Sequence, residues 1–417
     1  MHFVLLNQFY PPSVLPTGVM LEAVASGLAA RGHQVSVVCG GGSVGEAGGN
    51  PVKVRRLGAL SHGKPSFIAK LAGYASFYAG VFWTLLWMKP RPDVIVALTT
   101  PPFLSLLARL AAWRHGGKHA HWIMDLYPDV MVAHGMLREG GIVNKLLVAV
   151  ARWGMGGKRR ALVLALGPDM AERSSRYLPA GQSAEWVPLW GTAAEPCEAG
   201  AVADLRPQRG WTPEEVVFLY SGNMGLGHRF SEVYAAAPLL CQEEPERNIR
   251  LAFYGGGKRM VEVEKALAQM KALGIPQLSA EIHGYVPSAQ LAEHLASGDV
   301  HLASLEPAWD GMMVPSKLQG IFAAGRPVLF TGSRTCSIGQ WILASGGGWV
   351  CAPGDVAAHV LAMQEALNPD ERAKRGAAAR RFAGEWFDRG KNVERIVDRL
   401  IGQPVEEKPS VACHFPV

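Results

Sequence analysis

The sequence lacks a stretch of apolar residues that is long enough, and uninterrupted enough by charged residues and glycines, to cross a lipid bilayer. Of its 417 residues, 49% are hydrophobic and 18% are charged. The longest apolar stretch, residues 66–88, contains Lys70, Gly73 and Gly80, which makes it a poor membrane span. The N-terminus, MHFVLLNQFYPP, has no basic segment and no small-residue cleavage site, so it predicts a first strand and not a signal peptide. We therefore expect a globular protein of the cytoplasm.

Paired cysteines are also absent. The six cysteines are scattered along the chain and form no Cys-x-x-Cys pair. This excludes zinc-ribbon and thioredoxin-like sites and predicts ordinary buried thiols.

Acidic residues are outnumbered by basic ones, 35 to 41, which gives a formal net charge of +6. A basic surface suits nucleic acid, anionic lipid or phosphorylated substrates. The basic residues come in short clusters, such as Lys158-Arg159-Arg160, without a DNA- or RNA-binding motif. We therefore expect no nucleic-acid partner.

The first half of the chain alternates short apolar runs with helical patterns. HFVLLNQF, GVMLEAVASGLAARG and QVSVVCGGG predict a strand, a helix and a second strand, with Gly32 in a left-handed conformation at the helix end. Further strands are expected within residues 93–100, 119–127 and 160–166. This alternation predicts a doubly wound parallel sheet.

The alternation of apolar runs and helical patterns stops between Trp190 and Trp211 and then resumes. The segment between these two residues is rich in Ala, Gly and Pro and predicts a linker at residues 191–211. The second half then repeats the α/β alternation through VVFLYSG, IRLAFYGGG, AEIHGYV, DVHLASL and RPVLFTG. We expect two Rossmann-like domains that face a cleft, residues 1–190 and 212–384. Residues 385–402 are expected to form a helix that packs back onto the first domain, and 403–417 a tail.

Glycines follow several of the predicted strands. The first strand is not followed by Gly-x-Gly-x-x-Gly, and Gly18 either lets a phosphate approach a helix N-terminus or forms a structural turn. Residues 220–229, YSGNMGLGHR, combine three glycines with His228 and Arg229 as cations for a diphosphate. Three consecutive glycines at residues 255–257 also fit a simple permissive turn.

The segment at residues 310–320, DGMMVPSKLQG, predicts the start of another helix. Pro315 and Ser316 are typical of a helix N-terminus. The amides of Ser316 and Lys317 would then point at an anion, with the Lys317 ammonium in support. A helix cap without a ligand is the alternative.

Together these segments resemble one family. NQFYPP…PTG, DVIVALTTPPFL, WIMDLYPDV, YSGNMG…H, FYGGG, HGYVP and VPSKLQGIFAAGRPVLF are similar to the retaining glycosyltransferases of family 4, which have the GT-B fold. The similarity is strongest to the bacterial branch that builds O-antigen, capsule and exopolysaccharide, and it runs in order along nearly the whole chain. It implies transfer of a hexosyl or N-acetylhexosaminyl group from a nucleotide-diphosphate donor, preferably a UDP-sugar. The acceptor it implies is a glycan, often linked to polyprenyl diphosphate, and neither a metal nor another cofactor is required.

The resemblance also implies roles for individual residues. Catalytic roles fall to Asp125, His228, Arg229 and Lys317. The donor's nucleotide and diphosphate would be bound by Gly18, Ser221, Gly222, Asn223, Gly225, Gly257, Tyr285, Val286, Ser316 and Lys317. The sugar would contact Asp310, Gly311 and Met312.

The chain departs from the family pattern at Asn223, which takes the position of an arginine, and at three further positions. The two glutamates that many members carry, seven residues apart, fall on Met312 and Gly320, and the histidine that often precedes Asp125 is Met124. Asp310 and Glu306 are alternatives for the first glutamate. These departures leave two other hypotheses open: a non-catalytic GT-B protein that binds nucleotide or glycan, and a GT-B-like sugar-nucleotide epimerase or hydrolase.

Residues 66–88 carry aromatic side chains at helical spacing, with cations on both flanks. Such a helix either covers the first sheet as part of the core or lies in the headgroup layer of a membrane. Trp83, Trp87 and the basic excess favour contact with an anionic membrane surface, the inner face of the plasma membrane.

Overall fold

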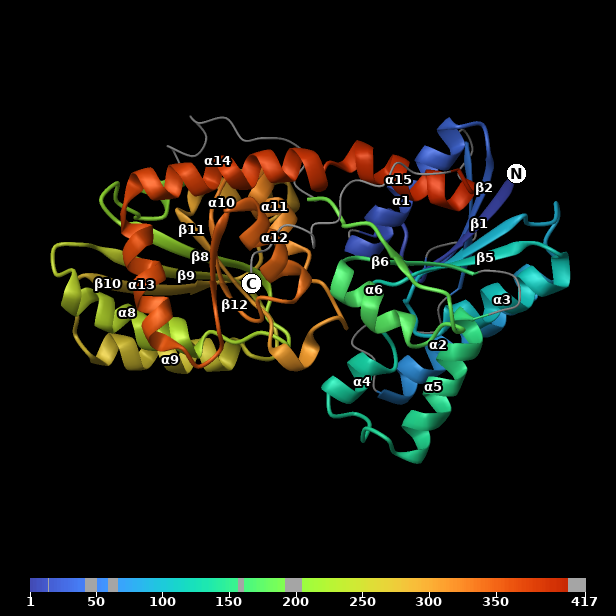
Figure 1. The fold of residues 1–417 in the computed structure, drawn as a ribbon, viewed down its shortest axis with the longest axis horizontal. Helices are drawn as coiled ribbons and strands as arrows, with labels where there is room; N and C mark the ends of the chain where they lie inside the picture. The colour runs from blue at the N-terminus through green and yellow to red at the C-terminus, as the bar shows by residue number, and fades with distance from the viewer. Residues whose placement is uncertain (14, 42–50, 59–66, 157–160, 192–204, 404–417) are drawn as a thin grey trace. The chain divides into compact units, whose positions relative to one another are not determined.

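The computed structural model describes residues 1–13, 15–41, 51–58, 67–156, 161–191 and 205–403 (Figure 1). Contacts divide the chain into two compact units. The first contains Met1–Pro188, Gly311–Val314 and the described residues from Gly390 onward. The second contains Leu189–Asp310 and Pro315–Arg389.

The first unit is built on a parallel sheet of seven strands in the order β3-β2-β1-β4-β5-β6-β7. All five residues of β1 are buried, as expected for a strand covered on both faces. The strands are β1 (His2–Leu6), β2 (Gln34–Gly40), β3 (Val52–Leu57), β4 (Val94–Ala97), β5 (Lys118–Trp122), β6 (Leu162–Ala165) and β7 (Glu185–Trp186). The sequence analysis missed β3, whose VKVRRL is rich in charge, and β7, which has two residues.

Helices pack against this sheet. They are α1 (Pro16–Ala30), α2 (Phe67–Leu86), α3 (Leu104–His115), α4 (Asp129–Ala133), α5 (Ile142–Met155), α6 (Pro168–Ser175) and α15 (Arg389–Ile401). Gly32 follows α1 with a φ of 77°, the predicted left-handed conformation. Phe77, Val81 and Leu85 of α2 pack with Val4 and Ile95 of the sheet, so one face of this helix belongs to the core.

The last helix, α15, is held to the first unit by contacts far apart in sequence. Asp398 pairs with Arg31 at 2.5 Å, and the Asn392 side chain donates to the carbonyl of Pro188 at 3.1 Å. These contacts close the chain back onto the unit where it began.

The second unit is a parallel sheet of six strands in the order β10-β9-β8-β11-β12-β13. Its strands are β8 (Val216–Asn223), β9 (Ile249–Gly256), β10 (Leu278–His283), β11 (Val300–Ser304), β12 (Val328–Thr331) and β13 (Gly348–Cys351). Its helices are α8 (Ser231–Glu243), α9 (Met260–Ala272), α10 (Leu291–Ser297), α11 (Lys317–Ala323), α12 (Ser337–Ser345), α13 (Val356–Leu367) and α14 (Pro369–Trp386). The predicted α/β class, with two Rossmann-like parallel sheets, is confirmed.

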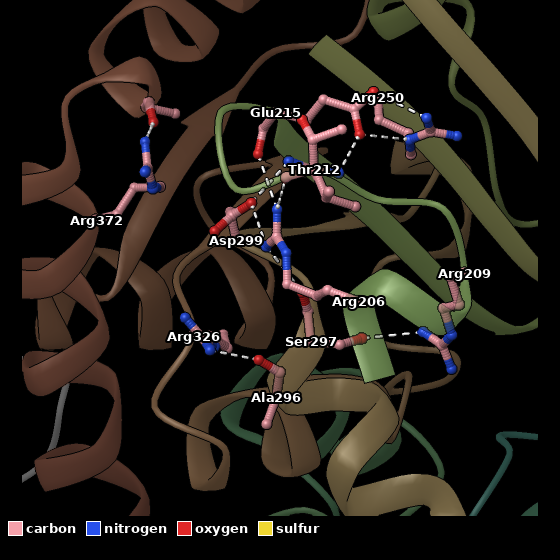
Figure 2. A network of polar contacts seen from close by, with 12 residues as sticks. Arg206, Arg209, Thr212, Glu215, Arg250, Ala296, Ser297, Asp299, Arg326 and Arg372 are labelled. Carbon is pink, nitrogen blue, oxygen red and sulfur yellow. Dashed lines mark hydrogen bonds and ion pairs between the residues drawn. The ribbon is translucent and has the colours of Figure 1, made fainter. Parts of the chain in front are cut away.

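Hydrogen bonds and ion pairs of Arg206 link the segments at the start of this sheet (Figure 2). Arg206 pairs with Asp299 at 2.9 Å and donates to the carbonyl oxygen of Glu215 at 2.9 Å. Asp299 also accepts from the backbone NH of Val217, at the beginning of β8, at 2.8 Å. Arg206 comes from the end of the predicted linker, of which residues 192–204 lie outside the described chain. The remaining part of that segment thus packs as part of the second unit.

Candidate active site

A cavity of about 190 Å³ opens at the carboxyl ends of β8 and β9. Ligands of open parallel sheets bind at this edge, because the strand ends and the following loops meet there. It is lined by Ser221, Gly222, Tyr254, Gly255, Tyr285, Val286, Leu291, Leu295, Ser316, Lys317, Gly320 and Ile321. The structure therefore brings together six of the predicted donor-binding residues: Ser221, Gly222, Tyr285, Val286, Ser316 and Lys317.

Glycines let the strand ends approach one another at this cavity. Gly222 and Gly255 have φ angles of 135° and 129°, which side chains rarely adopt. A Cβ atom on Gly255 would overlap the carbonyl oxygen of Gly222 on the neighbouring strand. A Cβ atom on Gly222 would lie 2.6 Å from Cε of Lys317. Gly222 therefore makes room for the lysine side chain as well as for the neighbouring backbone.

Lys317, the first residue of α11, sends its ammonium back towards the loop after β8. Its Nζ lies 3.3 Å from the carbonyl oxygen of Asn223 and 4.0 Å from the centre of the Tyr220 ring, and it donates to the Tyr220 hydroxyl. Within the described chain, no carboxylate oxygen lies within 4.0 Å of it. Burial without a counter-charge lowers the pKa of Lys317 to about 7.

His228 faces this ammonium as a neutral acceptor. Its Nδ1 lies 2.8 Å from the carbonyl oxygen of Ser304, which can only accept, so Nδ1 carries the proton. The lone pair of Nε2 then points at Nζ of Lys317, 3.5 Å away. Burial, reinforced by the Lys317 charge, lowers the pKa of His228 to about 3. His228 is thus neutral at pH 7, whereas the sequence analysis expected a cation.

Arg229, the other predicted cation, is already paired. It lies 2.5 Å from a carboxylate oxygen of the buried Glu232 and 3.6 Å from one of Glu306. Glu306, an alternative for the missing family glutamate, also pairs with Arg259 at 3.4 Å. Of the described residues that line the cavity, Lys317 alone carries a cationic side chain.

The remaining predicted residues of this loop shape its backbone. The side-chain oxygen of Asn223 accepts from the Tyr285 hydroxyl at 3.2 Å, and the carbonyl of Gly225 accepts from the NH of His228 at 3.2 Å. Gly257 has a φ of 128°, and a Cβ atom there would overlap the backbone of Met224. Asp310 ends a short 3-10 turn, with its NH bonded to the carbonyl of Pro307 at 3.1 Å.

Four of the predicted residues belong to the first unit. Gly18 lies in the first turn of α1, where a Cβ atom would come within 3.1 Å of the backbone of Phe9 and Tyr10. Its missing side chain thus lets α1 pack against the loop after β1. Asp125 forms a backbone bridge with Met313, next to Met312, whose carbonyl accepts from Leu126 at 2.8 Å.

The surroundings of Asp125 raise its proton affinity. Its NH and that of Met124 both donate to the Thr99 hydroxyl at 3.2 Å, and Met124 is buried. Burial raises the pKa of Asp125 to about 6. Gly311, with a φ of 69°, donates its NH to the Asp169 carboxylate at 3.1 Å, which anchors the segment beside Asp125.

Two aromatic residues of the site escaped the sequence analysis. Tyr220 bonds to Lys317, and Tyr254 lines the cavity while stacking on His283 at a centroid distance of 4.6 Å. Each stands one or two residues before a glycine at the end of a buried strand, Tyr220 in YSG and Tyr254 in FYGGG. A polar aromatic residue at that position is the signal that could have identified them.

No cluster of three or more His, Cys, Asp or Glu side chains within the described ranges could hold a metal ion. The donor set of the cavity is instead one ammonium, backbone amides and hydroxyl groups, which are suited to an anionic ligand.

Comparison with known proteins places this site in context. Residues 17–190 match the family model described as "Glycosyl transferase 4-like domain". The putative colanic acid biosynthesis glycosyl transferase WcaI of Escherichia coli K12 is 25% identical over 411 residues, covering 94% of this chain and 98% of the relative. The probable glycosyltransferase WbjE of Pseudomonas aeruginosa is 25% identical over 284 residues, 67% of each chain.

Solved structures show the same fold at lower sequence identity. Anabaena Alr3699/HepE in complex with UDP superposes with a TM-score of 0.66 at 15% identity, covering 96% of this chain and all (100%) of that one. WaaG, a glycosyltransferase involved in lipopolysaccharide biosynthesis, gives a TM-score of 0.64 at 18% identity, with 96% and 100% covered. Residues 17–190 are therefore identified as a glycosyl transferase 4-like domain, the relatives support glycosyltransferase activity, and the two Rossmann-like units have the GT-B fold.

Proposed function

We propose that this glycosyltransferase moves a sugar from a UDP-sugar to a lipid-linked glycan acceptor in cell-surface polysaccharide assembly, with retention of anomeric configuration. The observation that carries the donor proposal is Lys317, which lines the cavity at the ends of β8 and β9 and whose ammonium has no carboxylate partner among the described residues. A diphosphate supplies the missing negative charge. The names of WcaI and WaaG, which refer to colanic acid and lipopolysaccharide, support the polysaccharide part.

In the proposed reaction, an acceptor hydroxyl attacks the anomeric carbon while the bond from that carbon to the diphosphate oxygen breaks. The proton of the hydroxyl passes to the leaving phosphate on the same face, so no protein nucleophile and no metal are needed. Negative charge grows on the diphosphate as the bond breaks, and stabilising such charge is commonly the largest catalytic contribution. Lys317 and the amides of Ser316 and Lys317 would provide this stabilisation, and Asp125 would orient the sugar or the acceptor.

Uridine is the base we favour. HepE was solved with UDP bound, and its fold is that of this chain. In the cavity, Tyr254 and Tyr285 offer aromatic faces, and Val286 lies beside them. Tyr285 is 65% exposed and its ring lies against Gly256, so it is free to cover a planar base.

The acceptor is proposed to be a polyprenyl-diphosphate-linked glycan, reached from the cytoplasmic face of the plasma membrane. Residues 66–88 would contact this membrane. In α2, Phe77, Val81 and Leu85 are buried, whereas Trp83 on the adjoining face is exposed. The core and membrane interpretations of this helix are thus compatible, because they concern different faces.

Calorimetric titration with UDP, GDP and ADP tests the donor proposal. We expect UDP to bind more tightly than the other two. Equal affinities for all three would remove the base assignment, and absence of binding by any of them would overturn the proposal.

A second candidate is a GT-B protein that binds nucleotide without transfer, or one that acts as a sugar-nucleotide epimerase or hydrolase. It is favoured by Gly320, which lines the cavity at a position where the family resemblance implies a glutamate. Incubation of the protein with UDP-sugars, with and without a lipid-linked acceptor, separates these cases. Transfer requires the acceptor, hydrolysis and epimerisation do not, and binding without any product identifies the inactive protein.

A further inference from the structure

Three neighbouring helices of the first unit contain no acidic residue. α3 packs against both α2 and α5 (Figure 1). None of the three contains Asp or Glu, whereas α3 and α5 carry four cations: Arg109, Arg114, Lys145 and Arg152. The guanidinium of Arg109 lies 4.4 Å from the centre of the Trp153 ring and so connects α3 with α5.

The same helices expose large apolar side chains. Of the 12 tryptophans in the sequence, Trp83, Trp87, Trp113 and Trp153 are exposed on or directly after these helices. Trp113 is 82% exposed and Ile142, the first residue of α5, is 88% exposed. Leu110, Val143 and Leu146 add further exposed apolar surface. We call these exposed side chains, together with the four cations, the α2-α3-α5 surface.

A groove between α2 and α3 interrupts this surface. Its volume is about 200 Å³, and its lining is Phe82, Leu85, Leu86, Leu107, Leu110, Ala111, Trp113 and Arg114. Arg114 is the one charged residue among the described residues of this lining. The groove thus pairs an apolar slot with a cation at its edge, which matches a hydrocarbon chain attached to an anionic headgroup.

Contiguous exposed apolar surface marks a site of interaction. Tryptophan prefers the boundary between hydrocarbon and water, and lysine and arginine bind anionic headgroups. A symmetric pairing of two copies through this surface would set cations against cations, with no carboxylate on the three helices to compensate. Within the described ranges, no helix is long and apolar enough to span a bilayer. A protein lying on an anionic bilayer fits these observations together.

We propose that the α2-α3-α5 surface docks onto an anionic lipid bilayer, with one hydrocarbon chain of a lipid in the groove between α2 and α3. This goes beyond the membrane contact of residues 66–88, because α3 and α5 supply the most exposed apolar residues and all four of the cations named above. It does not depend on donor binding, since every residue of the surface belongs to the first unit.

The test is co-sedimentation with phosphatidylcholine vesicles, with and without phosphatidylglycerol, of the full chain and two matched variants. Leu146 on α5 and Leu361 on α13 are 63% and 62% exposed. Leu146→Glu places a carboxylate in the proposed contact, and Leu361→Glu makes the same change in the second unit. We expect wild type and Leu361→Glu to sediment with the anionic vesicles and Leu146→Glu to bind about tenfold more weakly. Phe82→Glu, in the groove, should weaken binding as well.

Several outcomes would overturn the proposal. Wild type that stays in the supernatant with anionic vesicles is one, and equal sedimentation of Leu146→Glu and wild type is another. Light scattering without lipid provides a third: a dimer that Leu146→Glu dissociates would make the surface an interface between copies. Unfolding temperature and UDP affinity, measured on each variant, keep misfolding and failure of the donor proposal apart from failure of docking.

Discussion

Nζ of Lys317 and Nε2 of His228 lie 3.5 Å apart, although 89 residues separate them in the sequence. The geometry makes the histidine a neutral acceptor, and no carboxylate of the described residues pairs with the ammonium. We expect this pair to bind an anion, since the lysine is held in place by Tyr220 and Asn223 before a ligand supplies the opposite charge. The predictions that follow concern this site and the contacts that hold it.

Replacement of Lys317 by Met should weaken UDP binding by about tenfold or more, because a charge-assisted contact to the diphosphate is worth about 1.5–3 kcal/mol. Calorimetry measures the effect. Lys258→Met is the matched control, because Lys258 is an exposed lysine that follows the neighbouring glycine turn and does not line the cavity. Equal losses in both variants would indicate a general effect of charge and remove Lys317 from the site.

UDP binding should be accompanied by proton uptake near neutral pH. The pKa of Lys317 is lowered to about 7, so the free protein holds this site only partly protonated at pH 7 to 8, and a bound diphosphate raises the pKa again. Affinity should therefore fall as pH rises above about 7. Calorimetry in buffers of different ionisation enthalpy counts the protons. A proton number that stays the same in Lys317→Met would contradict the assignment.

Gly222→Ala should impair UDP binding as Lys317→Met does. The new Cβ would lie 2.6 Å from Cε of Lys317, at a φ of 135°, so the lysine must move. Gly274→Ala is the control, because Gly274 also has a positive φ, 63°, but no atom within 4 Å of the added Cβ. It should cost about 1 kcal/mol of stability and leave UDP affinity unchanged. Wild-type affinity in Gly222→Ala would show that the lysine position is not critical.

Asp125→Asn should raise the unfolding temperature at pH 8, and the gain should shrink towards pH 4. Burial raises the pKa of Asp125 from 3.8 to about 6, so the native state binds a proton more readily than the unfolded chain. The free energy of unfolding of the wild type therefore decreases as pH rises from about 4 to about 6, and the decrease stays constant above pH 6. The asparagine side chain of the variant does not ionise, so the variant shows no such decrease. Thermal unfolding across this pH range measures the difference, and a pH-independent gap would refute the explanation.

Arg206→Ala should destabilise the second unit by about 3 kcal/mol, because it leaves the largely buried Asp299 without its cation. Denaturant unfolding measures this loss. Arg381→Ala, at an exposed position of α14, should stay within about 0.5 kcal/mol of wild type. If Arg206→Ala lost no more stability than Arg381→Ala, the network in Figure 2 would contribute little to the stability of the second unit.

The sequence predicted the strands that are continuously apolar, such as β1 and β8, because burial on both faces leaves a clear pattern. It missed β3, where lysine and arginine interrupt the apolar residues, and β7, which is too short for a period. It also located the loops around Gly222 and Ser316, because glycine permits backbone angles that other residues rarely adopt and proline restricts φ. It could not show that Arg229 is neutralised by Glu232 and Glu306, since the second of these lies far along the chain.

The sequence by itself determined the two α/β halves and the loops at the strand ends, because apolar periodicity, glycine and proline act over a few residues. Only the tertiary structure decided which side chains meet. Lys317 reaches Tyr220, 97 residues earlier, because α11 and β8 pack in one unit and Gly222 leaves space between them. Its lowered pKa follows from that packing, since burial away from water is a property of the folded surroundings.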